Sequence, residues 1–345
     1  MLTFLVAILI SFIIVILFLP GAIRMLRERG IVGIDVHKPD RPEVPKGGGF
    51  VLLMAIVTSL LFIIGLTTFQ SLDGVNPGIL AALVSILMAS MIGLLDDNLD
   101  FSNRTKIVLP LIASIPMIVM QVGTTTMTIP FLGTLDLGIA YPLIVIPLMM
   151  TFIIDSTNMY GGMNGLEVGL SSINASAVVL YVILIPIVSG DPATNGQMDA
   201  GTVAAALLGA SLAFFIFNRY PAKVLPGDVG RLPLGAAMGV ALILGNMDRL
   251  ALILYAPFML NFLLYLIYKV YVKRKGIEWE KFAKLREDGT LQVLGPFTLY
   301  WLLPHFSKKI TEKKNVAILI LLQAILAYLA VLMLLIGFPF GIGWI

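Results

Sequence analysis

The segment 155–167 combines carboxylates, amides and glycines in a pattern that could bind a charged ligand. Asp155, Asn158 and Asn164 carry oxygen atoms that suit a cation, and Gly162 is one of three glycines that let a ligand approach the backbone. Long apolar runs precede and follow the segment, so it lies where a membrane helix meets water. A turn whose glycines allow tight packing and whose asparagine caps a helix would need the same residues, and both readings stay open.

Two adjacent carboxylates, Asp96 and Asp97, end an apolar run and are followed by Asp100. A charged group at the bilayer centre costs about 2.5 to 3.5 kcal/mol on insertion scales, so the pair belongs at the water edge or beside a cation. Neighbouring carboxylates suit metal binding or proton abstraction. The alternative is an acidic helix end before a solvated loop, which is the more common meaning of an isolated Asp-Asp pair.

A third acid, Asp228, follows Pro226-Gly227 and has Lys223 and Arg231 nearby in sequence. A flexible backbone, a carboxylate and flanking cations together suit a phosphate that carries a divalent metal. Taken alone, Pro-Gly-Asp is an ordinary turn. The run Lys273-Arg274-Lys275 is weaker, since basic clusters beside inner helix ends usually bind lipid headgroups.

The elements that must position these residues are membrane helices. The chain of 345 residues is 59% hydrophobic and 12% charged, which excludes a soluble domain of ordinary composition. Apolar runs near the ~20 residues needed to cross a bilayer recur along its length, whereas membrane strands would alternate with period two. The sequence therefore predicts an all-α, polytopic membrane protein with about ten transmembrane helices, as a single domain over residues 1–345.

The ten predicted spans are residues 2–20, 50–66, 78–95, 106–121, 138–154, 168–188, 200–217, 232–244, 250–270 and 316–336. The first has neither a positively charged start nor a small-residue cleavage site, so we expect a retained helix and not a signal peptide. Without cysteine, the chain has no thiol nucleophile, thiolate metal site or disulfide framework.

The basic residues are distributed unevenly between the two sides of these spans. All but Arg249 of the 23 lysines and arginines fall in the loops that follow odd-numbered spans. By the positive-inside rule, those loops are cytoplasmic, both termini face outward, and the acids and amides above share the cytoplasmic face.

The charge pattern favours an enzyme over a transporter. A transporter should place ionisable groups near helix midpoints, but the midpoints of these spans carry almost no ionisable residues. An interfacial enzyme whose substrate has an anionic and a lipidic part fits better, with Mg²⁺ and lysines neutralising phosphates.

Three connecting segments carry smaller expectations. The segment 24–49 should form an ordered loop or a short helix, and 122–137 could form a short hairpin. In the last inner loop, 278–286 could be an amphipathic helix, and 296–306 has the aromatic residues of an interfacial segment.

Together these segments resemble the polyprenyl-phosphate N-acetylhexosamine-1-phosphate transferase family, in particular its eukaryotic and archaeal branch. The resemblance covers nearly the whole chain and depends on several motifs in the family's order. The motifs are Gly93-Leu94-Leu95-Asp96-Asp97 with Lys106 downstream, Asn158 to Glu167, Asn218-Arg219-Tyr220-Pro221 leading to Gly227-Asp228, and Arg286-Glu287-Asp288-Gly289.

This resemblance implies roles for individual residues. Asp96 and Asp97 would form the catalytic acidic pair, and Lys106 would stabilise phosphate charge. Asn158 and Asp228 would hold Mg²⁺, with Mn²⁺ as an alternative. The substrate-binding candidates are Asp35, Lys38, Asp100, Asp155, Gly162, Asn164, Lys273, Arg274 and Lys275, among which Gly162 and Asn164 would meet the uridine.

Two departures from the family pattern bear on the substrate. Bacterial members have a histidine cluster in the last inner loop, where this chain has only His305. The run Lys273-Arg274-Lys275 also lacks the central histidine of the eukaryotic Arg-His-Arg segment. The first departure points away from the peptidoglycan and enterobacterial branches, and the second leaves the sugar open.

The implied reaction moves an N-acetylhexosamine 1-phosphate from its UDP-sugar to a polyprenyl phosphate such as dolichyl phosphate. The main candidate for the transferred group is GlcNAc-1-phosphate. UMP is released, and lipid-linked glycan synthesis for protein glycosylation begins. A transporter of nucleotide sugars or lipid-linked sugars is the alternative, and a lipid-binding scaffold is a third reading. The expected location is a multi-pass cell membrane, archaeal first, or the endoplasmic reticulum in a eukaryote. The partners are membrane lipid but no nucleic acid, and a homodimer stays open.

Overall fold

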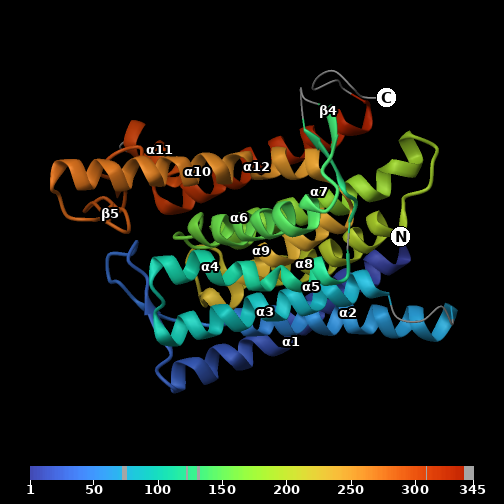
Figure 1. The fold of residues 1–345 in the computed structure, drawn as a ribbon. Coiled ribbons are helices and arrows are strands. Elements are labelled where there is room, and N and C mark those ends of the chain that lie inside the picture. Colours follow the sequence, from blue (N-terminus) through green and yellow to red (C-terminus); the bar gives the residue numbers. More distant parts are fainter. Residues whose placement is uncertain (72–75, 122, 130–132, 308, 338–345) are drawn as a thin grey trace.

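The computed structural model describes residues 1–71, 76–121, 123–129, 133–307 and 309–337. The helices are α1 (Leu2–Glu28), α2 (Gly49–Ser71), α3 (Pro77–Leu99), α4 (Asn103–Ala113), α5 (Ile115–Val119), the π-helical turn η1 (Tyr141–Val145), α6 (Ile146–Met159), α7 (Leu166–Val188), α8 (Asn195–Asn218), α9 (Asp228–Leu244), α10 (Asp248–Lys275), α11 (Leu299–Phe306) and α12 (Glu312–Leu335). The long helices lie side by side in one bundle (Figure 1).

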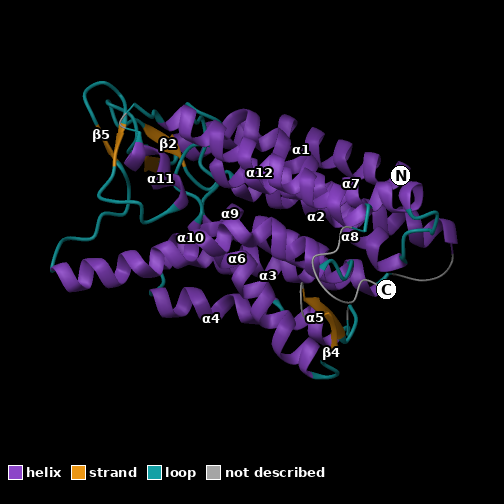
Figure 2. Cartoon of the chain, turned by 90° about the horizontal axis from the view of Figure 1, so that it is seen from above, coloured by secondary structure: helices purple, strands orange, loops and turns teal. Residues whose placement is uncertain are grey.

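Short antiparallel hairpins lie at the two ends of the bundle (Figure 2). They are β1 (Val32–Ile34) with β2 (Glu43–Pro45), β3 (Thr126–Ile129) with β4 (Gly133–Asp136), and β5 (Lys284–Leu285) with β6 (Leu291–Gln292). The first and third hairpins and α11 gather at one end, whereas β3 and β4 lie at the other, together with the N-terminus and the last turns of α12 (Figure 1). The predicted hairpin in 122–137 is confirmed, and so is an ordered loop in 24–49.

Eight helices in the described residues are long and apolar enough to cross a membrane, which confirms a polytopic helical membrane protein. They are Leu2–Glu28, Gly49–Phe69, Pro77–Leu99, Tyr141–Met159, Leu166–Val188, Asn195–Asn218, Asp248–Lys275 and Glu312–Leu335. The other two predicted spans are helical but shorter. The count of about ten therefore stays a prediction, as do the sides on which the termini and the site lie.

Each shorter helix has a local cause. The predicted span 106–121 is split into α4 and α5 at Ser114, because Pro116 has no N–H to continue the ladder and disfavours helix in the residue before it. Helix α9 has 17 residues and lies within the bundle, packed against α3, α6 and α8. Two of its glycines allow this: a Cβ at Gly235 would lie 2.6 Å from Ile154 Cα, and one at Gly239 would lie 2.7 Å from Met150 Sδ.

The predicted amphipathic helix at 278–286 is wrong. The segment is irregular before β5 and lies against α10, where the Tyr268 hydroxyl bonds both backbone groups of Glu280, accepting from N–H at 3.0 Å and donating to C=O at 3.1 Å. Trp279 packs on the Tyr268 ring at 4.3 Å between centroids. These side chains replace the backbone bonds that a helix would have made.

Candidate functional site

Three carboxylates from distant parts of the chain meet at the end of the bundle that carries α11. Asp96 and Asp97 lie in the last turns of α3, and Asp228 begins α9. The backbone N–H of Val229 donates to Asp97 Oδ2 at 2.9 Å. Gly93 makes this approach possible, because a Cβ there would lie 2.1 Å from the Asp228 carbonyl oxygen. We call Asp96, Asp97 and Asp228 the acidic cluster.

Each member of the acidic cluster lies near one cation. Lys106 Nζ, on α4, is 3.0 Å from Asp96 Oδ1, and Lys46 Nζ, just after β2, is 2.9 Å from Asp97 Oδ1. Arg231, one turn further along α9, is 3.6 Å from Asp228 Oδ1. Each acid of the cluster thus has a cation within 4 Å, and such a mixed site suits a polyanionic substrate with a bound cation.

The acidic cluster alters the proton affinity of Asp228 and of the neighbouring Lys106. Burial raises the pKa of the Asp228 carboxyl; Arg231 opposes this rise, and the neighbouring Asp97 and Asp96 add to it. Partial burial lowers the pKa of Lys106, but the hydrogen bond to Asp96 and the surrounding carboxylates outweigh it, so that this pKa lies above its ordinary value. Lys106 therefore stays positively charged at neutral pH.

Asp155 and Asn158 lie near the acidic cluster, on the last turns of α6. This helix packs against both α9 and α4, which carry Asp228 and Lys106. Asn158 is three positions after Asp155, so the two side chains share one helix face. Within the described residues, neither side chain makes a hydrogen bond or ion pair, which leaves their oxygen atoms available for a ligand.

The turn after α6 is joined to the acidic cluster through Glu167. A Cβ at Gly161 would lie 3.3 Å from Glu167 Oε2, and Glu167 Oε1 accepts from Arg231 Nε at 3.0 Å. Arg231 in turn pairs with Asp228. The structure thus connects Asn158 with the acidic cluster indirectly, and no direct contact is described between Asn158 and Asp228.

A second buried cluster forms around Lys38 in the first loop, residues 29–48. Lys38 Nζ lies 3.0 Å from Asp35 Oδ2 and 2.5 Å from Glu312 Oε2, and it donates to Asn164 Oδ1 at 3.0 Å. The Asn164 N–H donates to Glu312 Oε1 at 2.7 Å. We call Asp35, Lys38, Asn164 and Glu312 the Lys38 cluster.

The Lys38 cluster also contacts the segment 220–222, after α8. The Ala222 N–H donates to Asn164 Oδ1 at 2.9 Å, and Lys38 Nζ lies 4.1 Å from the Tyr220 ring centroid. Gly162 adopts φ +148°, which favours glycine, and a Cβ there would lie 3.8 Å from the Tyr300 ring. The first loop joins the two clusters, since Lys38 and Lys46 come from its two halves.

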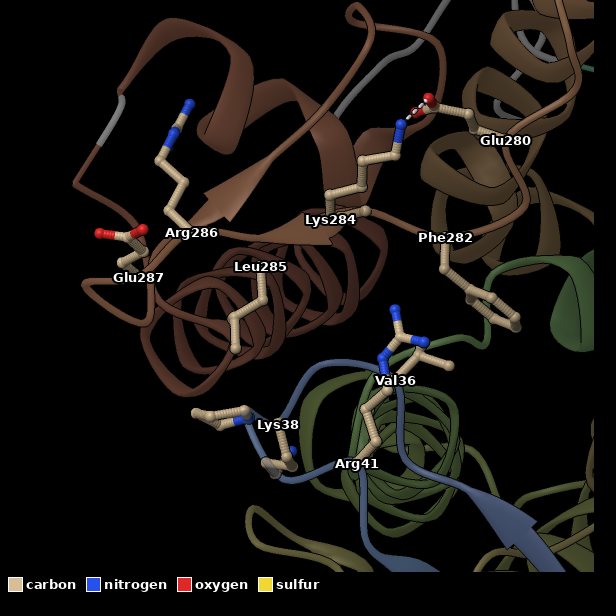
Figure 3. Close-up of a pocket in the computed structure, with 11 residues that line it drawn as sticks. Val36, Lys38, Arg41, Glu280, Phe282, Lys284, Leu285, Arg286 and Glu287 are labelled. Carbon is tan, nitrogen blue, oxygen red and sulfur yellow. Dashed lines mark hydrogen bonds and ion pairs between the residues drawn. The ribbon is translucent and has the colours of Figure 1, made fainter.

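A cavity of about 630 Å³ lies beside the Lys38 cluster, between the first loop and the segment 280–287. Figure 3 shows Lys38 and Arg41 on one side and Phe282 and Lys284 on the other. Arg286 also lines the cavity, whose acids are Glu280 and Glu287. Glu280 already pairs with Lys284. Cations beside an aromatic ring suit a phosphorylated ligand with a planar base.

Of the other predicted site residues, three lie apart from the clusters and Asp100 lies at the edge of the acidic cluster. Lys273, Arg274 and Lys275 are exposed in the last turn of α10, which extends beyond the neighbouring helices (Figure 2). The Asp100 side chain is fully exposed at 102%, and its carboxylate is 3.8 Å from Lys106 Nζ. Their predicted roles in substrate binding are not tested by these positions.

Sequence reasoning missed Glu312 and Lys46 as site residues. Glu312 is the first residue of an apolar helix, where an acid usually marks only the helix start. Its one distinguishing signal is that it is the only acid in the sequence between Lys308 and Lys314, among four lysines. Lys46 was seen as one charge among several, although it directly precedes Gly47-Gly48-Gly49.

The fold and the clusters define a polytopic helical membrane protein with a mixed acidic and basic site at one end of its bundle. The profile of the family described as Glycosyl transferase family 4 matches residues 79–246. A protein of Saccharolobus solfataricus, provisionally named UDP-N-acetylglucosamine–dolichyl-phosphate N-acetylglucosaminephosphotransferase, is 34% identical over 340 residues, 96% of this chain and 97% of that protein. The chain therefore belongs to glycosyl transferase family 4.

Two other relatives agree with this assignment. A protein of Sulfolobus acidocaldarius with the same provisional name is 32% identical over 288 residues, 83% of each chain. The UDP-N-acetylglucosamine–dolichyl-phosphate N-acetylglucosaminephosphotransferase of Dictyostelium discoideum is 28% identical over 282 residues, 71% of this chain and 67% of that protein. The similarity thus extends to both archaeal and eukaryotic proteins, as the sequence motifs indicated.

Proposed function

We propose that this protein transfers GlcNAc 1-phosphate from UDP-GlcNAc to a polyprenyl phosphate and releases UMP. Dolichyl phosphate is the main candidate for the acceptor. The observation that carries the proposal is the acidic cluster with its cations Lys46, Lys106 and Arg231. The names of the relatives give the substrate pair. The transporter alternative has no such support, because the acidic cluster lies at helix ends and not at helix midpoints.

Mg²⁺, with Mn²⁺ as its substitute, fits the residues present. Hard divalent cations prefer oxygen ligands, and the Asn158 and Asp155 side chains offer oxygen atoms that no described residue occupies. Asn158 and Asp228 would hold the ion, with Asp155 close by. Bound there, Mg²⁺ would neutralise pyrophosphate charge and make the sugar-bearing phosphorus more electrophilic.

In the proposed reaction, an oxygen of the polyprenyl phosphate attacks the phosphorus that bears the sugar. A P–O bond forms there, and the anhydride bond to UMP breaks, so that UMP leaves with the electron pair. Lys46 and Lys106 orient the phosphates and offset their charge. One carboxylate oxygen of Asp96 or Asp97 takes the proton of a monoanionic acceptor or orients it. A covalent aspartyl intermediate is the competing route.

The donor is expected to lie along the first loop, between the two clusters. The 630 Å³ cavity has a size typical of small-molecule sites. Lys38 lines it, but its three N–H groups face Asp35, Glu312 and Asn164, so the phosphates of a ligand there would be met by Arg41 and Arg286, which also line the cavity. Gly162 and Asn164 remain our candidates for contact with the uridine.

Transfer of radiolabelled GlcNAc 1-phosphate tests the proposal directly. Purified protein, UDP-GlcNAc labelled in the sugar, dolichyl phosphate and Mg²⁺ should give a labelled lipid and an equal amount of UMP. Asp97→Asn should remove both products. UDP-GlcNAc that accumulates inside proteoliposomes without UMP release would show a transporter instead, and bound donor without either outcome would show a binding protein.

A further inference from the structure

A second cavity, of about 490 Å³, lies between the ends of α8 and α12 that point toward the clusters. One wall is the last turns of α8 with Phe215, Ile216 and Arg219, and the other is one face of the first turns of α12, with Lys313, Val316, Ala317 and Ile320. Spacings of three, four and seven residues place the α12 residues on a single face. We call this cavity the α8–α12 groove.

The floor of the α8–α12 groove is the start of α7. A Cβ at Gly165 would lie 2.9 Å from the Phe215 ring, and one at Gly169 would lie 2.4 Å from Ile320 Cδ1. The two wall side chains therefore lie directly on the α7 backbone. The walls continue along the bundle as exposed apolar side chains, Leu212 at 41% and Ile216 at 44% on α8 and Leu321 at 60% on α12.

The rim of the α8–α12 groove is cationic. Arg219, Lys223 and Lys313 line its end, and all three side chains are exposed. In the part of the chain that the structure describes, none of the three forms an ion pair with a carboxylate. Glu312, beside Lys313 in sequence, is buried and directed to Lys38. An unneutralised cationic rim above an apolar channel matches a ligand with an anionic head and a hydrocarbon tail.

The α8–α12 groove is separate from the acidic cluster. Glu167 lies two residues from both Gly165 and Gly169, so its side chain leaves α7 on roughly the opposite face. There it pairs with Arg231 of α9, next to Asp228. An anionic head held at Arg219 and Lys313 is therefore on the far side of α7 from Asp97. The α8–α12 groove is thus not the position at which the acceptor phosphate reacts.

We propose that the α8–α12 groove is a binding site for an anionic membrane phospholipid. Its phosphate lies among Arg219, Lys223 and Lys313, and an acyl or isoprenoid chain lies between α8 and α12 over Gly165 and Gly169. Charge complementarity at the rim and the apolar walls select this ligand over a free phosphate or a zwitterionic lipid. The site is close to the Lys38 cluster, since Asn164 and Tyr220 also line the groove.

Lipid binding to the purified full-length chain tests the proposal without any substrate. Delipidated protein in detergent is titrated with phosphatidylglycerol or phosphatidylcholine of the same chain length, and bound lipid is counted by native mass spectrometry. The rim variant combines Arg219→Gln, Lys223→Gln and Lys313→Gln. Its matched control combines Arg24→Gln, Arg27→Gln and Arg29→Gln, which remove equal charge from exposed positions at the same end of the bundle.

The wild type and the matched control should bind phosphatidylglycerol about tenfold more tightly than phosphatidylcholine, and the rim variant should lose that preference. Ala317→Phe, at an exposed groove position, should weaken phosphatidylglycerol binding with no change of charge. Equal binding by the rim variant and its control would overturn the proposal, and so would glycerol phosphate that competes as well as the whole lipid. Stoichiometric displacement of phosphatidylglycerol by polyprenyl phosphate would show an acceptor site instead.

Because binding is measured without UDP-GlcNAc, failure of this site and failure of the proposed transferase reaction are distinguishable. A protein that transfers GlcNAc 1-phosphate but shows no lipid preference would refute only the α8–α12 groove as a lipid site. A protein that binds phosphatidylglycerol as expected but forms no UMP would refute only the enzyme.

Discussion

Asp97 accepts a hydrogen bond from the backbone N–H of Val229 at 2.9 Å, which fixes the end of α3 against the start of α9. The same carboxylate pairs with Lys46. One side chain thus joins three segments that are far apart in sequence, and its second oxygen faces a cation that a phosphate could take over.

Asp97→Asn should reduce transfer activity by about 100-fold or more, because the amide keeps an oxygen for the Val229 N–H but has no charge to take a proton. UMP release and labelled lipid measure the loss. The control Asp191→Asn removes one carboxylate from the exposed loop between α7 and α8 and should be fully active. Wild-type turnover by Asp97→Asn would remove this acid from catalysis.

The contact between α3 and α9 can be tested with no change to a polar group. Gly93→Ala adds a methyl group that would lie 2.1 Å from the Asp228 carbonyl oxygen, so the helices must separate. We expect a destabilisation of about 1 to 3 kcal/mol, seen as a lower Tm, and a loss of activity as Asp228 moves from Asp96. Gly65→Ala is the matched control, because a Cβ there has no neighbour within 4 Å. If both variants behave alike, the close approach is not required.

The bundle could largely be predicted from the sequence, whereas the Lys38 cluster could not. Apolar runs long enough for a bilayer determine helices whatever their partners, so every predicted span is helical. Lys38 and Glu312 are 274 positions apart, and no local pattern connects them. The helix prediction for the segment 278–286 was wrong for the same reason, since the conformation of this segment depends on Tyr268 of α10. Asp96 was singled out because it ends an apolar run with a charge, and Asp228 because it lies in a Pro-Gly turn between two cations.

Removal of one carboxylate from the Lys38 cluster should lower the free energy of unfolding. Glu312→Gln keeps an oxygen for the Asn164 N–H but leaves Asp35 as the one carboxylate beside the buried Lys38, and we expect a loss of about 3 kcal/mol in unfolding free energy. The double variant Glu312→Gln/Lys38→Met should be less stable than Glu312→Gln, because the buried Asp35 carboxylate then loses the cation beside it. Thermal unfolding in detergent measures both. A Tm of Glu312→Gln equal to that of the exposed control Glu287→Gln would contradict this role.

Chelation of divalent metal should abolish transfer, and Mg²⁺ or Mn²⁺ should restore it. Asn158→Ala should raise the Mg²⁺ concentration for half-maximal activity by about tenfold or more, because it removes an oxygen ligand. Asn98→Ala is a matched control, since the exposed Asn98 amide only donates to the Leu94 carbonyl at 2.6 Å. Identical Mg²⁺ titrations of the two variants would exclude Asn158 as a ligand.

The orientation in the membrane can be tested because the sequence contains no cysteine, so one introduced cysteine is a unique label. Asp40→Cys lies in the exposed part of the first loop, near the clusters, and Asp191→Cys lies in the loop between α7 and α8. By the positive-inside rule, a membrane-impermeant maleimide should label Asp191→Cys in intact cells, and Asp40→Cys only after permeabilisation. The reverse pattern would place both clusters on the outer face, where a cytosolic nucleotide sugar could not reach Lys38 or the acidic cluster.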